Sequence, residues 1–342
     1  MHALLLEAPN RFSVTERPLP ERGDRDVVLR IHRAGICATD ITTIKGESPV
    51  AIYPMTPGHE LIATVEEPAA AAPAFAKGDW VTIYPTQGCG HCDACARKED
   101  NHCATFRVQG VHRDGGCFAE FMVVPEDQLL AVPATLRNDA GALIEPTAVA
   151  THAIRRSALK SGQRIAVIGA GSIGLLIAQA AKAAGAGYVA VVDQLPERAE
   201  TCRALGFDQF VLSDGNLART LAQYGEFDIV FDNVGAPATL AVAVDALRTR
   251  GTLVMLAFPH GSDPVTLPYP KVYRKELDVI VSRNYAREDF TASIALLEGG
   301  KIDAARMITA TYPLAKFADA FADLRGNPAR HLKILISPKE QV

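Results

Sequence analysis

A glycine-rich turn constrains the possible folds of this chain more than any other feature of its sequence. The hexapeptide from Gly169 to Gly174 reads G-x-G-x-x-G, follows the apolar run at residues 164–168, and opens a segment with helical periodicity that ends near residue 184. In a strand–turn–helix unit, Gly169 allows a tight turn, Gly171 lets the backbone approach a pyrophosphate, and Gly174 lets helix and strand pack closely. The pattern therefore predicts a dinucleotide site in a parallel α/β sheet.

The same region predicts NAD as the ligand. Asp193 lies nineteen residues after Gly174, at the end of the next predicted strand. A carboxylate there accepts hydrogen bonds from both ribose hydroxyls and repels a 2′-phosphate, which favours NAD over NADP. Ser172 and Ile173 begin the helix, whose N-terminal N–H groups favour phosphate. Arg198 is either a neighbour of the adenosine end, which leaves use of NADP open, or a solvated helix residue. The alternative for the whole motif is a glycine turn with a purely structural role.

Strands and helices alternate through the middle of the chain, from about residue 148. The predicted strands span residues 164–168, 188–192, 227–231 and 251–256, and the predicted helices span residues 172–184, 196–205 and 238–247. Such alternation is typical of βαβ units in a doubly wound parallel sheet.

The two ends of the chain have a different pattern. Short β-rich runs separated by Gly- and Pro-containing turns span residues 3–6, 27–34, 61–66, 80–84 and 118–124, which favours a barrel-like β fold. The tail combines a helix at 288–297 with strands near 310–312 and 332–336, and so resembles the first part. We therefore expect an α/β plus β fold, in which residues 1–148 and 285–342 form one domain and residues 149–284 are inserted as the nucleotide-binding domain.

Four of the seven cysteines lie within fifteen residues, with the spacing C-x2-C-x2-C-x7-C: Cys89, Cys92, Cys95 and Cys103. Four thiolates on a short polar loop suit one tetrahedral Zn²⁺ with no open coordination position. Such a structural zinc would hold the loop, residues 88–104, in shape and would perform no chemistry. Two disulfides are the alternative.

Composition and charge exclude several classes of protein. The chain has 342 residues and a net charge of −4, so it lacks the basic excess of a zinc ribbon that binds nucleic acid. No apolar run is long enough to cross a membrane, and the N-terminus lacks the pattern of a secretory signal. Clustered cysteines without export fit a reducing compartment. We therefore expect a cytoplasmic protein that acts on a small molecule.

Three further motifs carry candidate ligands for a second, reactive zinc ion: Cys37-Ala38-Thr39-Asp40, Gly58-His59-Glu60 and Glu145-Pro146. A catalytic zinc takes three protein ligands and leaves one position for water or substrate. Cys37, His59 and one of the carboxylates Glu60 and Glu145 would suffice. Each residue taken alone is more often a buried thiol, a hydrogen-bonded His–Glu pair or a solvated carboxylate. Asp40 either supports the ligands from behind or caps a helix.

Together these motifs resemble those of zinc-containing medium-chain dehydrogenases over essentially the whole chain. Glu145-Pro146 stands where simple alcohol dehydrogenases typically carry a cysteine ligand, so the chain is more similar to the polyol and sugar-acid branch. The segments 110–116 (GVHRDGG), 142–156 (ALIEPTAVATHAIRR) and 282–284 (SRN) resemble those of L-galactonate and L-gulonate 5-dehydrogenases. Cys117 is an additional residue relative to the Gly-Gly-Phe stretch of those relatives, close to where the resemblance places the substrate cleft.

The resemblance implies a GroES-like catalytic domain, an inserted Rossmann domain, NAD, and two zinc ions per chain, one catalytic and one structural. It implies that Cys37 and His59 bind the catalytic zinc, and that Glu60 and Glu145 bind it directly, through water or in exchange. The hydroxyl of Thr39 would begin the relay that removes a proton while a secondary alcohol is oxidised to a ketone. Members of the family are dimers or tetramers, commonly paired through the edge strands of the nucleotide sheet, so we expect a homodimer or homotetramer.

The expected substrate is an aldonic acid or a polyol. A sugar acid requires cations or N–H groups for its carboxylate, and the candidates are His112, Arg113, Arg283 and Asn284, each of which is otherwise a solvated loop residue. L-Threonine is the alternative substrate within the same motif pattern. A non-catalytic nucleotide-binding protein with a single zinc ion is an alternative of a different class. A metal-free quinone or enoyl reductase is disfavoured, because such relatives lack both zinc sites.

Overall fold

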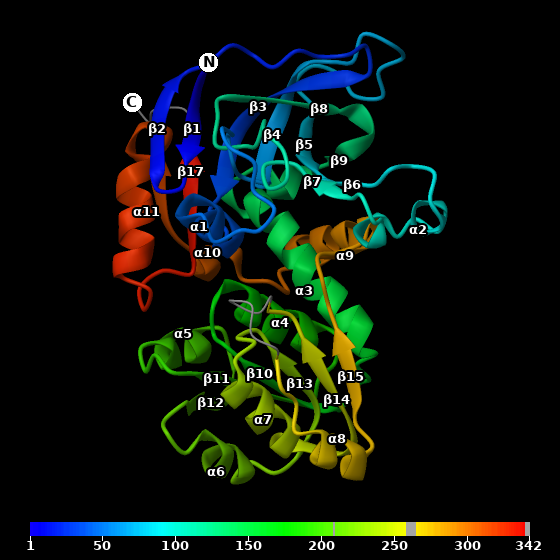
Figure 1. Ribbon diagram of the computed structural model, residues 1–342, viewed down its shortest axis with the longest axis vertical. Helices are drawn as coiled ribbons and strands as arrows, with labels where there is room; N and C mark the ends of the chain where they lie inside the picture. Colours follow the sequence, from blue (N-terminus) through cyan, green and yellow to red (C-terminus); the bar gives the residue numbers. More distant parts are fainter. Residues whose placement is uncertain (208, 258–264, 339–342) are drawn as a thin grey trace. The chain divides into compact units, whose positions relative to one another are not determined.

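The computed structural model describes residues 1–207, 209–257 and 265–338, and the chain divides into two compact units (Figure 1). The first unit comprises Met1–Glu145, Ala286–Glu298 and Met307–Val342, and the second comprises Pro146–Tyr285 and Gly299–Arg306. Residues 299–306 lie with the second unit, although the sequence analysis places them in the first domain. In this segment the N–H of Asp303 donates to Gln179 Oε1 at 2.7 Å, a long-range contact with a helix of the second unit.

The second unit is built on a six-stranded parallel sheet with the order β12-β11-β10-β13-β14-β15. Its strands are β10 (Arg164–Ile168), β11 (Tyr188–Asp193), β12 (Gln209–Leu212), β13 (Phe227–Asp232), β14 (Leu247–Met255) and β15 (Asp278–Val281). Its helices are α4 (Ser172–Ala183), α5 (Arg198–Ala204), α6 (Leu217–Ala222), α7 (Pro237–Ala246) and α8 (Tyr269–Lys275), while α3 (Ile144–Ser157) and α10 (Ala304–Met307) lie at its boundaries. The chain winds from β10 to one edge and from β13 to the other, which confirms the predicted doubly wound sheet.

The central strands of this sheet were predictable and its edge strands were not. Almost every side chain of β10, β11 and β13 is buried, as expected for parallel strands covered on both faces. The edge strands β12 and β15 have no such pattern, and Asp278, Val279 and Val281 of β15 are exposed. Strand β14 begins at Leu247, four residues before the predicted start, because the chain pairs with Phe227 there before a bulge.

The first unit contains a seven-stranded sheet with the order β16-β17-β3-β4-β5-β9, in which β8 also pairs with β3. Its strands are β3 (Asp26–Gly35), β4 (Glu60–Glu67), β5 (Trp80–Ile83), β8 (Phe121–Pro125), β9 (Leu129–Ala131), β16 (Ile308–Pro313) and β17 (Lys333–Ser337). Two separate pairs are β1 (His2–Ala8) with β2 (Arg11–Glu16), and β6 (Thr86–Gln87) with β7 (Arg107–Val108). Because β17 pairs with β3, the C-terminal tail belongs to the same sheet as the N-terminal part.

Short helices and a single apolar core complete the first unit. The helices are α1 (Ala38–Lys45), α2 (Asp93–Ala96), α9 (Arg287–Glu298) and α11 (Phe317–Gly326), with 3-10 turns at Asp100–His102, Glu126–Gln128, Ala134–Leu136, Asp139–Leu143 and Leu314–Lys316. The core packs side chains from β1, β3, β4, β5, β8 and α11, and includes the fully buried rings of Phe118 and Phe317, whose centroids lie 5.0 Å apart. This core supports the ends of β3 and β4, where the site described next is found.

Candidate functional site

Cys37, His59 and Glu60 lie together at adjacent ends of two paired strands. One ligand atom from each lies within 4.8 Å of the others. Cys37 follows β3 and caps α1, whereas His59 and Glu60 stand at the start of β4. In the antiparallel register of β3 and β4, Glu60 pairs with Gly35, so strand pairing alone brings the two motifs side by side. We refer to these three residues as the Cys37–His59–Glu60 cluster.

Gly35 makes room for the Glu60 carboxylate. A Cβ atom added to Gly35 would overlap Glu60 Oε2, so no larger residue fits at this register position without moving the carboxylate. Glu60 itself is fully buried. The absence of a side chain on β3 therefore decides where the carboxylate of β4 lies.

Asp40 supports the cluster from the first turn of α1. Its Oδ2 accepts a hydrogen bond from the N–H of Cys37 at 2.8 Å, and its Oδ1 lies 3.8 Å from His59 Nδ1. The capping hydrogen bond considered for Asp40 is present, and its role in supporting the metal ligands stays a prediction. Burial raises the pKa of Asp40 to about 6, although His59 and the N–H of Cys37 oppose the rise.

The electrostatics of the cluster favour a cation. Burial alone would lower the pKa of His59, but its hydrogen bond with Cys37 and the charges of Asp40, Cys37 and Glu145 raise that pKa well above its ordinary value. Among the described residues, His59 Nδ1 and Asp40 Oδ1 are buried without a hydrogen-bond partner. A thiolate, an imidazole and a carboxylate are the donors that zinc takes in catalytic sites. The residues present therefore fit a zinc ion.

Lys333 contacts this site and was missed by the sequence analysis. Its Nζ donates to Glu60 Oε1 at 2.7 Å, to Glu60 Oε2 at 2.6 Å and to the carbonyl of Ile36 at 3.1 Å. Lys333 is only 1% exposed, and the charge of Glu60 keeps its pKa above the ordinary value in spite of burial. The available signal in the sequence was a lysine directly before the apolar run at residues 334–336.

Thr39, Glu145 and Cys117 were also singled out in the sequence, but they are not among the three clustered ligands. Cys37 Sγ lies 3.7 Å from Thr39 Oγ1 in the first turn of α1. Glu145 is buried at the start of α3 and its charge acts on His59 and Lys333, but it is not among the ligand atoms that lie within 4.8 Å of one another. Cys117 is fully buried with its Sγ 3.5 Å from the Glu60 carbonyl, and burial raises the pKa of its thiol well above the ordinary value.

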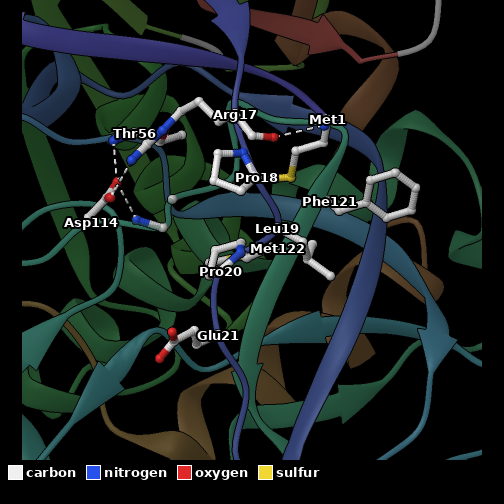
Figure 2. Close-up of a pocket in the computed structure, with 12 residues that line it drawn as sticks. Met1, Arg17, Pro18, Leu19, Pro20, Glu21, Thr56, Asp114, Phe121 and Met122 are labelled. Atoms are coloured by element: carbon white, nitrogen blue, oxygen red, sulfur yellow. Dashed lines mark hydrogen bonds and ion pairs between the residues drawn. The ribbon is translucent and has the colours of Figure 1, made fainter.

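Hydrogen bonds to Asp114 hold together segments of the first unit that contain Arg17 and Thr56 (Figure 2). Both oxygens of Asp114 accept hydrogen bonds from the Arg17 guanidinium, and Asp114 also accepts from the N–H groups of Thr56 and Gly115 at 2.6 and 2.7 Å. Burial would raise the pKa of Asp114, but these hydrogen bonds lower it. They fasten the turn that leads to His59. A pocket of about 320 Å³ beside Arg17 is lined by apolar residues and by Asp114 and Glu21, of which Asp114 is paired with Arg17.

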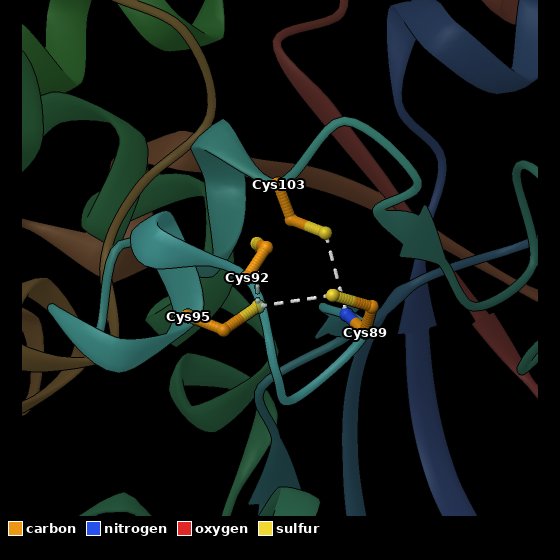
Figure 3. Close-up of side chains that lie close together, drawn as sticks. All are labelled: Cys89, Cys92, Cys95 and Cys103. Atoms are coloured by element: carbon orange, nitrogen blue, oxygen red, sulfur yellow. Dashed lines mark hydrogen bonds between the residues drawn. The ribbon is translucent and has the colours of Figure 1, made fainter.

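The four cysteines converge on one point (Figure 3). Cys92 Sγ and Cys95 Sγ lie 3.6 Å apart, and Cys89 Sγ and Cys95 Sγ lie 4.0 Å apart. These distances are too long for disulfides, and all seven cysteines, each in the described part of the chain, are free. They match the edge of a tetrahedron with Zn–S bonds of about 2.3 Å, which is roughly 3.8 Å. The backbone N–H of Cys89, followed by contacts with Thr105, lowers the pKa of Cys103 to about 6, whereas burial and the neighbouring thiols raise the pKa of Cys95 to about 12.

The glycine-rich turn joins β10 to α4 at the carboxyl end of the sheet. Gly169 has φ +98°, a conformation that glycine adopts without strain. A Cβ atom on Gly174 would overlap the Gly169 carbonyl oxygen, whereas one on Gly171 would meet no atom within 4 Å. The loop is therefore tightly packed at its third glycine and open above its second, where a pyrophosphate would lie. Ser172 and Ile173 form the first turn of α4.

Asp193 ends β11 and reaches back to the glycine-rich turn. Its Oδ2 accepts the N–H of Ala170 at 2.6 Å and its Oδ1 accepts the N–H of Leu195 at 2.9 Å. Arg198 is 5% exposed, which excludes the interpretation as a solvated helix residue, and its charge interacts with Asp193. Burial nevertheless leaves the pKa of Arg198 below its ordinary value.

Replacing Gly171 or Gly174 with alanine should distinguish an effect on NAD binding from an effect on folding. We expect Gly174→Ala to lower both the melting temperature and the NAD affinity, because its methyl group collides with Gly169. We expect Gly171→Ala, at φ −74°, to keep the melting temperature within about 2 °C and to weaken NAD by at least about tenfold, because its methyl group occupies the space above the turn. Thermal melts and NADH fluorescence titrations measure both. Equal NAD affinity in Gly171→Ala and the parent would contradict the placement of the pyrophosphate.

The four substrate candidates lie on loops of different units. In the first unit, His112 Nδ1 accepts the N–H of Val108 at 3.0 Å, and Arg113 donates to Gln87 Oε1 at 2.8 Å. In the second unit, Arg283 is exposed and Asn284 has φ +53°. Their role in binding substrate stays a prediction.

Two family profiles match the chain. The profile described as "Alcohol dehydrogenase GroES-like domain" matches residues 23–134, and the profile described as "Zinc-binding dehydrogenase" matches residues 172–299. A β-sheet unit with a buried Cys–His–Glu cluster and a doubly wound nucleotide-binding unit define the class as a metal-dependent dehydrogenase. None of the described helices combines the length and the hydropathy needed to cross a membrane.

Comparison with individual proteins describes this class of dehydrogenase more closely. The chain is 34% identical to "L-galactonate-5-dehydrogenase" of Escherichia coli K12 over 94% of each chain. A crystal structure described as a short chain alcohol dehydrogenase of E. coli CFT073 with NADH has a TM-score of 0.92 at 28% identity, covering 98% of this chain and 99% of the other. A putative zinc-binding dehydrogenase from Sinorhizobium meliloti 1021 bound to NADP has a TM-score of 0.91 at 30% identity, with the same coverage.

Other relatives are named as dehydrogenases of sugar acids and of polyols. The chain therefore belongs to the zinc-type alcohol dehydrogenase family, among its polyol and sugar-acid dehydrogenases. This confirms the resemblance inferred from the motifs, the GroES-like and Rossmann-like fold, and the assignment as an enzyme that acts on a small molecule.

Proposed function

We propose that the protein is a zinc- and NAD-dependent dehydrogenase that oxidises a secondary hydroxyl of an aldonic acid, such as L-galactonate or L-gulonate, or of a polyol, to a ketone. The Cys37–His59–Glu60 cluster carries this proposal, because its donors suit an electrophilic metal and the chain also contains a nucleotide fold. The proposed catalytic domain is 1–148 with 285–342, and the proposed NAD domain is 149–284.

The chain's own residues supply positioning and proton transfer. Zinc bound at the cluster contributes Lewis acidity toward the substrate hydroxyl, and NAD contributes the hydride acceptor. Cys37 and His59 would hold the metal, and Glu60 and Glu145 would be the carboxylates available to it. Asp40 orients the His59 ring through the 3.8 Å approach of Oδ1. The hydroxyl of Thr39, two residues after Cys37 in the first turn of α1, would accept the substrate's hydroxyl proton while giving up its own to water or to a ribose hydroxyl of the cofactor, so that the proton leaves to solvent.

Asp193 should decide between the two nicotinamide cofactors. We expect Asp193→Gly to weaken NAD binding and to reduce the preference for NAD over NADP by at least about tenfold, since a charged acceptor is lost and a 2′-phosphate is no longer repelled. Asp193→Asn is the matched control, because it removes the charge and keeps an acceptor for the Ala170 N–H. Kcat/KM with both cofactors measures the ratio. An unchanged ratio in both variants would remove Asp193 from the adenosine site.

A substrate panel tests the proposed reaction. The purified protein with zinc and NAD is assayed by the absorbance of reduced nicotinamide on L-galactonate, L-gulonate, sorbitol, xylitol and L-threonine. We expect the highest kcat/KM on an aldonate. Selective activity on L-threonine would favour the amino-alcohol alternative. A single zinc ion per chain and no activity on any alcohol would favour a non-catalytic nucleotide-binding protein.

We also propose that the protein is a homodimer or homotetramer of the cytoplasm. Edge strand β15 exposes Val281 at 62%, and α8 exposes Tyr269 and Tyr273 at 69% and 73%. Exposed apolar side chains on a strand with one free edge suit pairing with a second copy. The free thiols fit a reducing compartment.

A further inference from the structure

All three N–H groups of the Lys333 ammonium donate hydrogen bonds within the proposed metal site. It makes three hydrogen bonds, two to the Glu60 carboxylate at 2.6 and 2.7 Å and one to the Ile36 carbonyl at 3.1 Å. An ammonium has three N–H groups, so none is left for substrate or water. Lys333 therefore contacts the two segments that supply the metal ligands, one just before Cys37 and the other at Glu60.

The backbone at Lys333 is held as firmly as its side chain. Strand β17 lies between β16 and β3, and Thr309 Oγ1 donates to the Lys333 carbonyl at 3.1 Å. Thr309 Oγ1 also accepts the N–H of Leu332 at 3.2 Å. Because both the strand and the side chain are fastened, the position of the ammonium is set by the fold and not by the metal.

Stability alone is a weak reason for this ion pair. Glu60 is 0% exposed and Lys333 is 1% exposed, and buried ion pairs seldom stabilise a fold more than apolar side chains of the same volume. The charges around the cluster offer another reason for a lysine beside Glu60. Cys37, Asp40, Glu60 and Glu145 bring up to four negative charges to a site for one divalent ion, and Lys333 is the cation that the structure places on Glu60.

Resting on the proposed zinc function, we infer that Lys333 is a positioning residue that competes with the metal for the Glu60 carboxylate. Both carboxylate oxygens are shared with the ammonium, so Glu60 is a weaker and more readily displaced metal ligand than a carboxylate without such a partner. A weakly donating ligand leaves the metal more electrophilic and leaves a coordination position that substrate can take. Lys333 thereby sets the coordination state of the metal without touching the substrate.

The inference predicts a change in metal coordination when Lys333 loses its charge. In Lys333→Met, Glu60 loses the cation that the described part of the chain pairs with it and should bind the metal permanently. With Co²⁺ in the catalytic site, we expect weaker visible d–d absorption, as coordination rises above four, and metal release to a chelator slower by about tenfold. Lys333→Arg keeps the positive charge and should restore the parent spectrum. The metal of the four-cysteine loop is the internal control, and its release rate should not change.

A second mutation separates a positioning role from a structural one. In a Glu60→Gln background the carboxylate is absent, so adding Lys333→Met should change neither the Co²⁺ spectrum nor the release rate further. Equal effects of Lys333→Met in both backgrounds, or no effect in either, would overturn the inference. If Lys333→Met does not fold, Lys333→Gln takes its place in the same comparison. A parent protein that binds no metal at the cluster would refute the proposed function itself, whereas a bound metal that is indifferent to Lys333 would refute only this inference.

Discussion

Replacing Cys37 with alanine is expected to lower kcat/KM by at least about 10³-fold and to reduce the zinc content from two ions per chain to one. Cys37 provides the only thiolate of the Cys37–His59–Glu60 cluster, and a metal held by His59 and Glu60 alone lacks the third ligand of a catalytic zinc site. The nucleotide-binding unit contains no part of this cluster, so NAD affinity should stay within about twofold of the parent. Metal analysis, steady-state kinetics and NADH fluorescence measure the three quantities.

A control distinguishes loss of a ligand from loss of any buried thiol. Cys202 is fully buried in α5 of the second unit, so Cys202→Ala removes a thiol of equal size and should retain both zinc ions. Near-parent activity in Cys37→Ala would refute the assignment of the reactive metal. So would a zinc content that stays at two.

Removal of the structural zinc is expected to have the second largest effect. Cys103→Ala takes one of four converging thiols from the loop 88–104, whose only regular structure among the described residues is the four-residue helix α2 and a 3-10 turn. Structural zinc sites contribute on the order of 10 kcal/mol of binding free energy to the segments they organise. We expect the variant to lose one zinc ion and at least about 10 °C in melting temperature.

The catalytic zinc provides the contrast for this experiment. Cys37→Ala also loses one zinc ion, but its ligands lie on paired strands of a buried core, so its melting temperature should fall by less. Calorimetry of both variants compares them directly. If Cys103→Ala retained two zinc ions and the parent melting temperature, the loop would not be a closed zinc site.

Much of the second unit could be predicted because the residues that specify it lie close together in the sequence. The glycine turn, the buried strand before it and Asp193 lie within thirty residues of one another, and their spacing encodes one βαβ unit. Strand β15 was missed because an exposed edge strand has no periodic burial. Residues 299–306 group with this unit in the structure, and the hydrogen bond from Asp303 to Gln179 is a long-range contact that short sequence patterns do not reveal.

The metal site was predictable in part. The motifs at Cys37 and at His59 and Glu60 could be recognised, but only the register of β3 with β4 places their side chains within reach of one metal ion. Glu145 belongs to the same motif pattern, yet it is not among the three residues whose ligand atoms meet within 4.8 Å. Spacing along the chain does not distinguish Glu60 from Glu145, because the position of each carboxylate depends on the direction of its side chain after folding.

The amino-acid sequence by itself determined the class of protein: its short motifs specify a dinucleotide turn and two sets of zinc donors, since those requirements are met by residue types at fixed short spacings. Only the tertiary structure brought a Glu60 carboxylate oxygen within 4.8 Å of the donor atoms of Cys37 and His59, and placed Lys333, 273 residues away along the chain, on that carboxylate. The physical reason is that a buried ion pair between β4 and β17 forms only when both strands join one sheet.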